Sequence, residues 1–223
     1  MEMKKAFLVL EDGTKFEGTS FGADVDSAGE VVFNTGMVGY PESFTDPSYK
    51  GQILTLTYPL IGNYGVPNEA KDEHKILKNF ESSKIHLHGV IVSEYCEKPS
   101  HWNSKKTLGK WLKDQKVPGL SGIDTRALTQ KLRETGTMLG KIVRDPASEL
   151  EFYNPDLDNL VGQVSCKKPT VYKGGRKRVV LIDCGAKNNI LRSLLKRGIT
   201  VVRVPWNYDF VEAGEKFDGV FIS

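Results

Sequence analysis

Cys184 is the residue whose setting in this sequence most suggests chemical reactivity. It follows a predicted strand, Val179–Asp183, and comes shortly before a predicted helix that begins at Asn188. A thiol close to the N-terminus of a helix has a lowered pKa, and its thiolate is the better nucleophile. A strained nucleophile turn also needs small residues two positions before and after the nucleophile, and Ile182 occupies the first of these positions. The sequence therefore favours a structural role for Cys184.

The four histidines supply neither a base for this thiol nor a metal site of recognisable spacing. All of them precede Cys184 in the chain, at His74, His86, His88 and His101. His86 and His88 could place two imidazoles on one face of a strand, but two ligands do not complete a metal site. No carboxylate or cysteine stands nearby at a matching spacing. We therefore predict a solvent-facing strand edge here and no metal in this chain.

A dense turn, Thr45-Asp46-Pro47-Ser48-Tyr49, is the third segment with residues suited to binding. Aspartate and serine side chains in such turns accept hydrogen bonds from nearby backbone amides. Binding residues also concentrate on loops that a rigid scaffold positions. The composition of this segment alone favours a plain turn over a ligand contact.

Residues 145–178 are punctuated by prolines and glycines and become basic from Lys167 to Arg178. Their one aromatic residue after Lys167 is Tyr172, so the alternation of basic and aromatic residues that is typical of single-strand nucleic-acid binding is missing. Neither G-x-x-x-x-G-K-[ST] nor G-x-G-x-x-G opens a helix anywhere in the chain. We therefore predict a flexible connector, with no nucleotide site and no nucleic-acid partner.

The composition is that of a soluble globular protein. Of the 223 residues 39% are hydrophobic and 26% are charged, and the net charge of +3 is too small to favour nucleic acid or an anionic membrane. No run approaches the roughly 18 apolar residues that a membrane-spanning helix needs. The short apolar run at Phe7–Leu10 ends in a turn rather than in a cleavage site. Three unspaced cysteines suggest a reducing compartment, and we expect a cytoplasmic protein.

The elements that must position these residues fall into two regions with different patterns of predicted secondary structure. The first is an α+β region, rich in β-type runs with packed helices, which we assign to residues 1–150. Its strands are expected at Phe7–Leu10, Lys15–Glu17, Glu30–Asn34, Gln52–Tyr58, His88–Ser93 and Gly140–Val143. Helices are expected at Asn68–Phe80, Ser104–Asp114 and Asp124–Glu134, with Gly136 as a C-cap and a chain break at Pro118-Gly119.

A connector, 151–177, precedes the second region, which begins at residue 178. Strand, helix and strand follow one another as Arg178–Asp183, Asn188–Arg197 and Ile199–Val204, and a third strand is expected at Gly219–Ile222. This order predicts parallel strands joined through a helix. Parallel sheets usually have more strands and helices on both faces. We therefore expect 178–223 to be an incomplete α/β domain that continues in the natural protein.

Several stretches in this order resemble the small subunit of glutamine-dependent carbamoyl-phosphate synthase. The resemblance extends over nearly the whole chain, and so many ordered pieces are very rare by chance. They are Leu8–Thr14, Gly29–Thr35, Met37–Tyr40, Thr45–Tyr49, Gln52–Pro59, Ile61–Gly65, Ile123–Thr129 and Asp183–Arg192.

The resemblance implies a division of labour between two domains and two subunits. The N-terminal domain holds the small subunit against the large synthetase subunit, and the C-terminal part is the start of a class I glutamine amidotransferase domain. In that family a Cys-His-Glu triad hydrolyses L-glutamine through a thioester, and the ammonia passes to the large subunit. The large subunit uses ATP, a metal ion and bicarbonate to make carbamoyl phosphate for arginine and pyrimidine synthesis. The resemblance implies a heterodimer and leaves higher oligomers of it open.

One functional position of the family falls within this chain. Ser48 matches the glutamine-contacting serine, and its hydroxyl can donate to a carboxylate and accept from an ammonium. The nucleophile, its partners and a glycine-rich loop would follow Ser223, and Cys184 is not at the nucleophile position. We therefore expect the chain to hold no cofactor and to be inactive alone. Two alternatives stay open: a non-catalytic module that docks on the large subunit, and an unrelated α/β protein that binds a small ligand.

Overall fold

The computed structural model describes residues 4–223, which divide into two compact units. Residues 1–3, the start of the first predicted domain, lie outside the described residues. Both units combine helices with β-sheet, as the mixed α and β pattern predicts. Unit 1 comprises Met1–Thr45, Tyr49–Asn68 and Lys84–Asp158, and unit 2 comprises Asp46–Ser48, Glu69–Ser83 and Asn159–Ser223.

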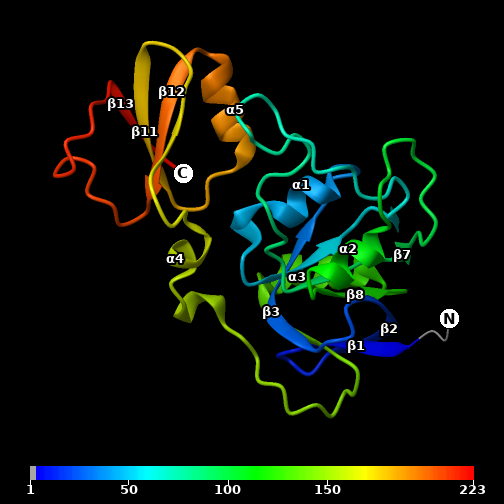
Figure 1. The fold of residues 1–223 in the computed structure, drawn as a ribbon. Coiled ribbons are helices and arrows are strands. Elements are labelled where there is room, and N and C mark those ends of the chain that lie inside the picture. The colour runs from blue at the N-terminus through cyan, green and yellow to red at the C-terminus, as the bar shows by residue number, and fades with distance from the viewer. Residues whose placement is uncertain (1–3) are drawn as a thin grey trace. The chain divides into compact units, whose positions relative to one another are not determined.

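Unit 1 is built around a closed sheet of seven strands in the order β1-β2-β8-β6-β4-β3-β9 (Figure 1). The strands are β1 Lys5–Leu10, β2 Lys15–Gly22, β3 Ser27–Asn34, β4 Gln52–Leu56, β6 Gly89–Ile91, β8 Pro118–Ser121 and β9 Met138–Val143. Four neighbours, β3, β4, β6 and β8, run parallel to one another, and the other pairs are antiparallel. A separate parallel pair joins β5 Leu60–Ile61 to β7 Glu94–Tyr95.

The core of unit 1 lies between this sheet and helix α3, Thr125–Thr135. Leu8, Ile53 and other apolar strand residues pack with Leu128 and Leu132 of the helix. The helix starts where expected, because the carboxylate of Asp124 accepts a hydrogen bond from a first-turn amide, and it ends at a glycine of positive φ. The remaining helices of the unit are α1 Tyr40–Thr45, α2 Leu108–Asp114 and the 3₁₀ turn Pro155–Leu157.

Pro118-Gly119 does not break the chain, contrary to the prediction from its sequence. Pro118 is the first residue of β8, where a proline removes no interior ladder hydrogen bond. Gly119 is required by packing, since a Cβ on it would lie 2.7 Å from the ring of Phe21. A Pro-Gly pair marks a turn only when neighbouring strands do not capture it.

Unit 2 contains a four-stranded sheet in the order β10-β12-β11-β13. Strand β11, Lys177–Asp183, is parallel to β12, Ile199–Pro205, and to β13, Gly219–Ile222, which confirms the predicted parallel pairing. Strand β10, Thr170–Tyr172, is antiparallel to β12. The segment expected as a connector, 151–177, therefore contains a strand of this sheet, and it also contains helix α4, Leu160–Val164.

Helix α5, Asn188–Lys196, covers one face of this sheet. Leu191 and Leu195 pack against Leu181 and Val201, while Val180 and two valines of β12 form a second cluster. The helix therefore buries one face of β11 and β12, and on the second cluster Ile182, Tyr208 and Phe210 pack instead. No helix of the described residues 4–223 is both long enough and apolar enough to cross a membrane.

The predicted helix over Asn68–Phe80 is wrong. The carboxylate of Asp72 accepts hydrogen bonds from the amides of His74 and Ile76, both at 2.9 Å, and Lys75 has a φ of 64°. A bridge between Lys71 and Leu77 closes this turn. Asp72, which resembled a residue of a first helical turn, instead accepts amides of the residues that follow it, and this local competition disfavours helix.

Candidate functional site

Ser48 lies in unit 2 on a short 3₁₀ turn, Pro47–Tyr49, that follows helix α1. The amide of Ser48 donates a 2.9 Å hydrogen bond to Oδ1 of Asp46, so the turn closes on the aspartate as the sequence predicts. The side chain of Ser48 is exposed, and its hydroxyl hydrogen-bonds to no residue among 4–223. This hydroxyl is therefore available to a ligand.

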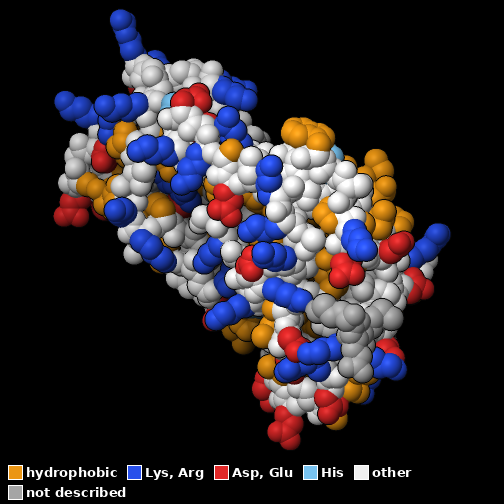
Figure 2. Space-filling model, turned by 45° about the vertical axis from the view of Figure 1, so that its right-hand side comes forward, with side chains coloured by type: hydrophobic (Ala, Val, Ile, Leu, Met, Phe, Trp, Pro, Cys, Tyr) orange, Lys and Arg blue, Asp and Glu red, His pale blue; other side chains and the backbone are white. Residues whose placement is uncertain are grey.

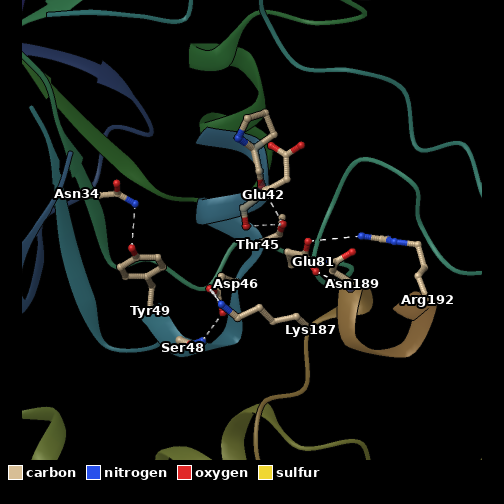
Figure 3. Close-up of polar contacts among 11 residues, drawn as sticks. Asn34, Glu42, Thr45, Asp46, Ser48, Tyr49, Glu81, Lys187, Asn189 and Arg192 are labelled. Atoms are coloured by element: carbon tan, nitrogen blue, oxygen red, sulfur yellow. Dashed lines mark hydrogen bonds and ion pairs between the residues drawn. The ribbon is translucent and has the colours of Figure 1, made fainter. Parts of the chain in front are cut away.

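The second oxygen of Asp46 binds a cation from a distant part of the chain. Nζ of Lys187 lies 2.6 Å from Oδ2 of Asp46 (Figure 3). The aspartate side chain is only 10% exposed and the lysine side chain is 41% exposed, so one end of the pair is shielded from water and the other reaches it. One carboxylate thus holds the backbone of Ser48 and the start of α5 together.

Close packing brings the turn that contains Ser48 into contact with the turn between β11 and α5. Gly185, between β11 and α5, has a φ of 110°, and a Cβ on it would lie 3.3 Å from Cβ of Pro47. Glycine is favoured here because it tolerates positive φ. Ser48 therefore lies beside the carboxyl end of a parallel strand, which is where α/β sheets commonly bind ligands.

Asp183 organises the strand end. It is fully buried, and Oδ1 accepts the amides of Gly185 and Ala186 at 3.0 and 2.8 Å. Its other oxygen accepts the amide of Cys166 at 2.7 Å and pairs with the guanidinium of Arg203 at 2.6 Å. Removing either charge would leave a buried ion without its partner, which is strongly destabilising.

The N-terminus of α5 is already satisfied from within unit 2. Glu81 accepts the amide of Asn189 through its carboxylate at 2.8 Å and the amide of Asn188 through its carbonyl. The same carboxylate lies 3.4 Å from the guanidinium of Arg192 (Figure 3). A negative charge at this end of a helix is favourable, because the free amides and the helix dipole attract it. The contacts of Glu81 at the start of α5 therefore have a structural role.

Cys184 lies between Asp183 and the start of α5. Its amide donates to the carbonyl of Ser223 at 2.5 Å, and its side chain is half-buried. No imidazole of residues 4–223 forms a hydrogen bond with its sulfur. Burial and the nearby carboxylate of Asp183 raise the pKa of the neighbouring Cys166 thiol to about 11, which disfavours its thiolate.

The histidine pair is not a solvent-facing strand edge, so that interpretation is wrong. His86 is 5% exposed, and Nδ1 of His88 donates to the carbonyl of Ala28 at 2.8 Å. Burial, opposed in part by that hydrogen bond, lowers the pKa of His88. Within residues 4–223 no three histidine, cysteine or acidic side chains cluster as metal ligands would.

Sequence reasoning missed the ion pair of Asp46 with Lys187 and the role of Glu81 at the start of α5. Asp46 and Lys187 are separated by most of the chain, and no spacing rule links them. Their pairing could be expected only from the topology that brings the turn after α1 to the turn after β11. The Ser48 hydroxyl, which bonds to none of residues 4–223, can donate to a carboxylate and accept from an ammonium group of a ligand.

Comparison with known proteins identifies the family of this chain. The family profile described as "Carbamoyl-phosphate synthase small chain, CPSase domain" matches residues 8–142. The chain therefore belongs to the carbamoyl-phosphate synthase small chain family.

Individual relatives match over the full chain. The carbamoyl phosphate synthase arginine-specific small chain of Eremothecium gossypii is 49% identical over 100% of this chain and 57% of its own length. The carbamoyl phosphate synthase small chain of Pyrococcus furiosus is 49% identical over 99% of this chain and 62% of its own length. The carbamoyl-phosphate synthase [ammonia], mitochondrial, of Homo sapiens is 48% identical over all of this chain and only 15% of its own length. The chain thus spans a little over half of the separate small chains and a small part of the longer relative.

Proposed function

We propose that the protein is the small chain of a glutamine-dependent carbamoyl-phosphate synthase and that it supplies the complex with ammonia from L-glutamine. The observation that carries this proposal is the pairing of family membership with an exposed, unbonded hydroxyl on Ser48. The hydroxyl contacts the glutamine, and residues 178–223 form the start of a class I glutamine amidotransferase domain. The parallel strands and crossover helix of unit 2 support that assignment.

The catalytic step needs residues that these 223 do not provide. Cys184 has no histidine partner and its neighbour Cys166 is held as a thiol, so we propose that this segment alone does not hydrolyse glutamine. A Cys-His-Glu triad elsewhere in the whole protein does so. ATP, its metal ion and bicarbonate are used by the synthetase partner, whose product serves arginine and pyrimidine synthesis. We propose a cytoplasmic heterodimer.

The test compares two ammonia sources in the assembled complex. Ser48→Ala should raise KM for glutamine at least tenfold, because one hydrogen bond to a charged group is worth roughly 1.5–3 kcal/mol. Carbamoyl phosphate synthesis from added ammonium chloride should not change, since it bypasses the glutamine site. Equal losses with both nitrogen sources would refute glutamine binding at Ser48.

A non-catalytic docking module is the second candidate. Unit 1 has its own closed sheet and its own core, which favours an independent binding domain. Under this proposal residues 1–150 bind the synthetase chain without any glutaminase. Binding of this segment in a complex that never responds to glutamine would favour the docking module over the ammonia-supplying subunit.

A further inference from the structure

A groove in unit 1 lies at the carboxyl ends of four parallel strands. Thr35, Thr57, Ser93 and Gly122 each follow one of the strands β3, β4, β6 and β8, and all four residues line the groove. Because these strands are mutually parallel, the residues that follow them meet at one edge of the sheet. Helix α3 forms the opposite wall, and the groove encloses about 790 Å³.

The helix wall carries two cations that no other side chain neutralises. Arg126 and Arg133 line the groove, are exposed, and form neither an ion pair nor a hydrogen bond with residues 4–223. The one carboxylate of the lining, that of Asp124, accepts the amide of Ala127 at 2.9 Å as the helix cap. The ion pair of the following turn is complete in itself, with Nζ of Lys131 on Oδ2 of Asp12. The groove is therefore positive.

Charges of both signs occur on the surface of the molecule. On the face drawn in Figure 2, Lys and Arg side chains lie among Asp and Glu side chains. Two unpaired guanidinium groups in one concave site are unlike this mixture of signs. Charge complementarity then calls for an occupant with more than one carboxylate.

The spacing of the two arginines favours a polypeptide over a small anion. Seven residues apart on one helix, their Cα atoms are about 10.5 Å from each other on the same face, which exceeds the size of one phosphate group. Thr129 and Gln130 lie between them on the groove wall and can bond a peptide backbone. An extended segment rises about 3.3 Å per residue and places every second side chain on one face, so acidic side chains two or four residues apart, about 6.6 or 13 Å, bracket the spacing of the pair.

We propose that this groove docks an acidic segment of the synthetase partner through Arg126 and Arg133. This inference rests on the proposed function, because it takes the synthetase as the partner. Arginine suits the task, since its planar guanidinium binds carboxylates through paired hydrogen bonds. The contact contributes to assembly and involves no residue of the Ser48 site.

The test measures the affinity of the whole small chain for the synthetase chain at two salt concentrations. Arg126→Glu combined with Arg133→Glu should weaken binding at least tenfold and flatten its salt dependence. Arg176→Glu is the matched control, because Arg176 is also exposed and unpaired, and it should change affinity less than twofold. Circular dichroism and the unfolding midpoint should be unchanged in all variants, and the milder Arg126→Gln should give an intermediate affinity.

A photo-crosslinking residue in place of Gln130 identifies the occupant. The expected product is a crosslink to a synthetase segment rich in Asp and Glu. Unchanged affinity of the double variant, or a crosslink to a segment without acids, would overturn the groove assignment while leaving the ammonia-supplying role intact. Inorganic phosphate binding that the double variant loses, without any effect on assembly, would show a small-anion site and also overturn it. Failure of the unmodified chain to bind the synthetase would overturn both proposals.

Discussion

The ion pair between Asp46 and Lys187 should control how well the whole protein uses glutamine. Replacing Lys187 with methionine keeps the aliphatic stem and removes the charge that lies 2.6 Å from the carboxylate. Two unit charges near a protein surface attract by about 4 kcal/mol at 4 Å. Exposed pairs realise only about 0.2–1 kcal/mol, because water screens them and forming the pair costs side-chain entropy.

The burial of the two ends decides between these limits. Asp46 is 10% exposed and Lys187 is 41% exposed, so the pair is screened on one side only. We therefore expect a loss of about 1–2 kcal/mol, between the exposed and buried cases. If that loss falls on the position of Ser48, KM for glutamine rises about 5- to 30-fold, since 1.4 kcal/mol is a factor of ten.

The assay uses the complete small chain bound to its synthetase. Glutamine-dependent synthesis should show the raised KM for Lys187→Met with little change in ammonia-dependent synthesis. Lys196→Met is the matched control, because Lys196 is exposed in the last turn of the same helix and pairs with nothing among residues 4–223. A Lys187 variant that loses stability but keeps its KM within twofold would refute the positioning argument and leave only a structural ion pair.

Three further outcomes follow from the structure. Glu81→Gln should lower the free energy of unfolding by about 1 kcal/mol in urea titrations, because it removes the charge at the start of α5; no loss at low salt would contradict this. The hydrogen bond from Lys131 holds the pKa of Asp12 at about 2. The stabilisation that comes from this lowered pKa is full above the unfolded-state pKa of about 3.9, and it should disappear as pH falls from 4 to 2. The stability difference between the parent and Asp12→Asn should therefore shrink across that range, and a constant difference would argue against the pair. Gly119→Ala should destabilise by about 1–3 kcal/mol through overpacking, whereas Gly219→Ala, whose Cβ has only a contact at 3.9 Å, should be near neutral; equal effects would contradict the packing argument.

Local signals were reliable where they did not depend on distant partners. The turn after the strand Phe7–Leu10, the capped helix α3 and the strand–helix–strand order after residue 178 were all predicted, because hydrophobic period and caps act within a few residues. The helix prediction for residues 68–80 failed for a local reason as well. Asp72 could cap a helix or close a turn, and short sequence cannot separate the two.

The amino-acid sequence by itself determined the family resemblance, the mixed α and β composition and Ser48 as the candidate binding residue. Only the tertiary structure decided that seven strands of unit 1 close into one sheet, that Pro118 begins a strand and that His86 is buried. It also decided which charges meet, joining Asp46 to Lys187 and leaving two arginines unpaired on α3. The physical reason is range: propensity and capping are set by neighbours in sequence, whereas burial and ion pairing depend on which distant segments the fold brings into contact.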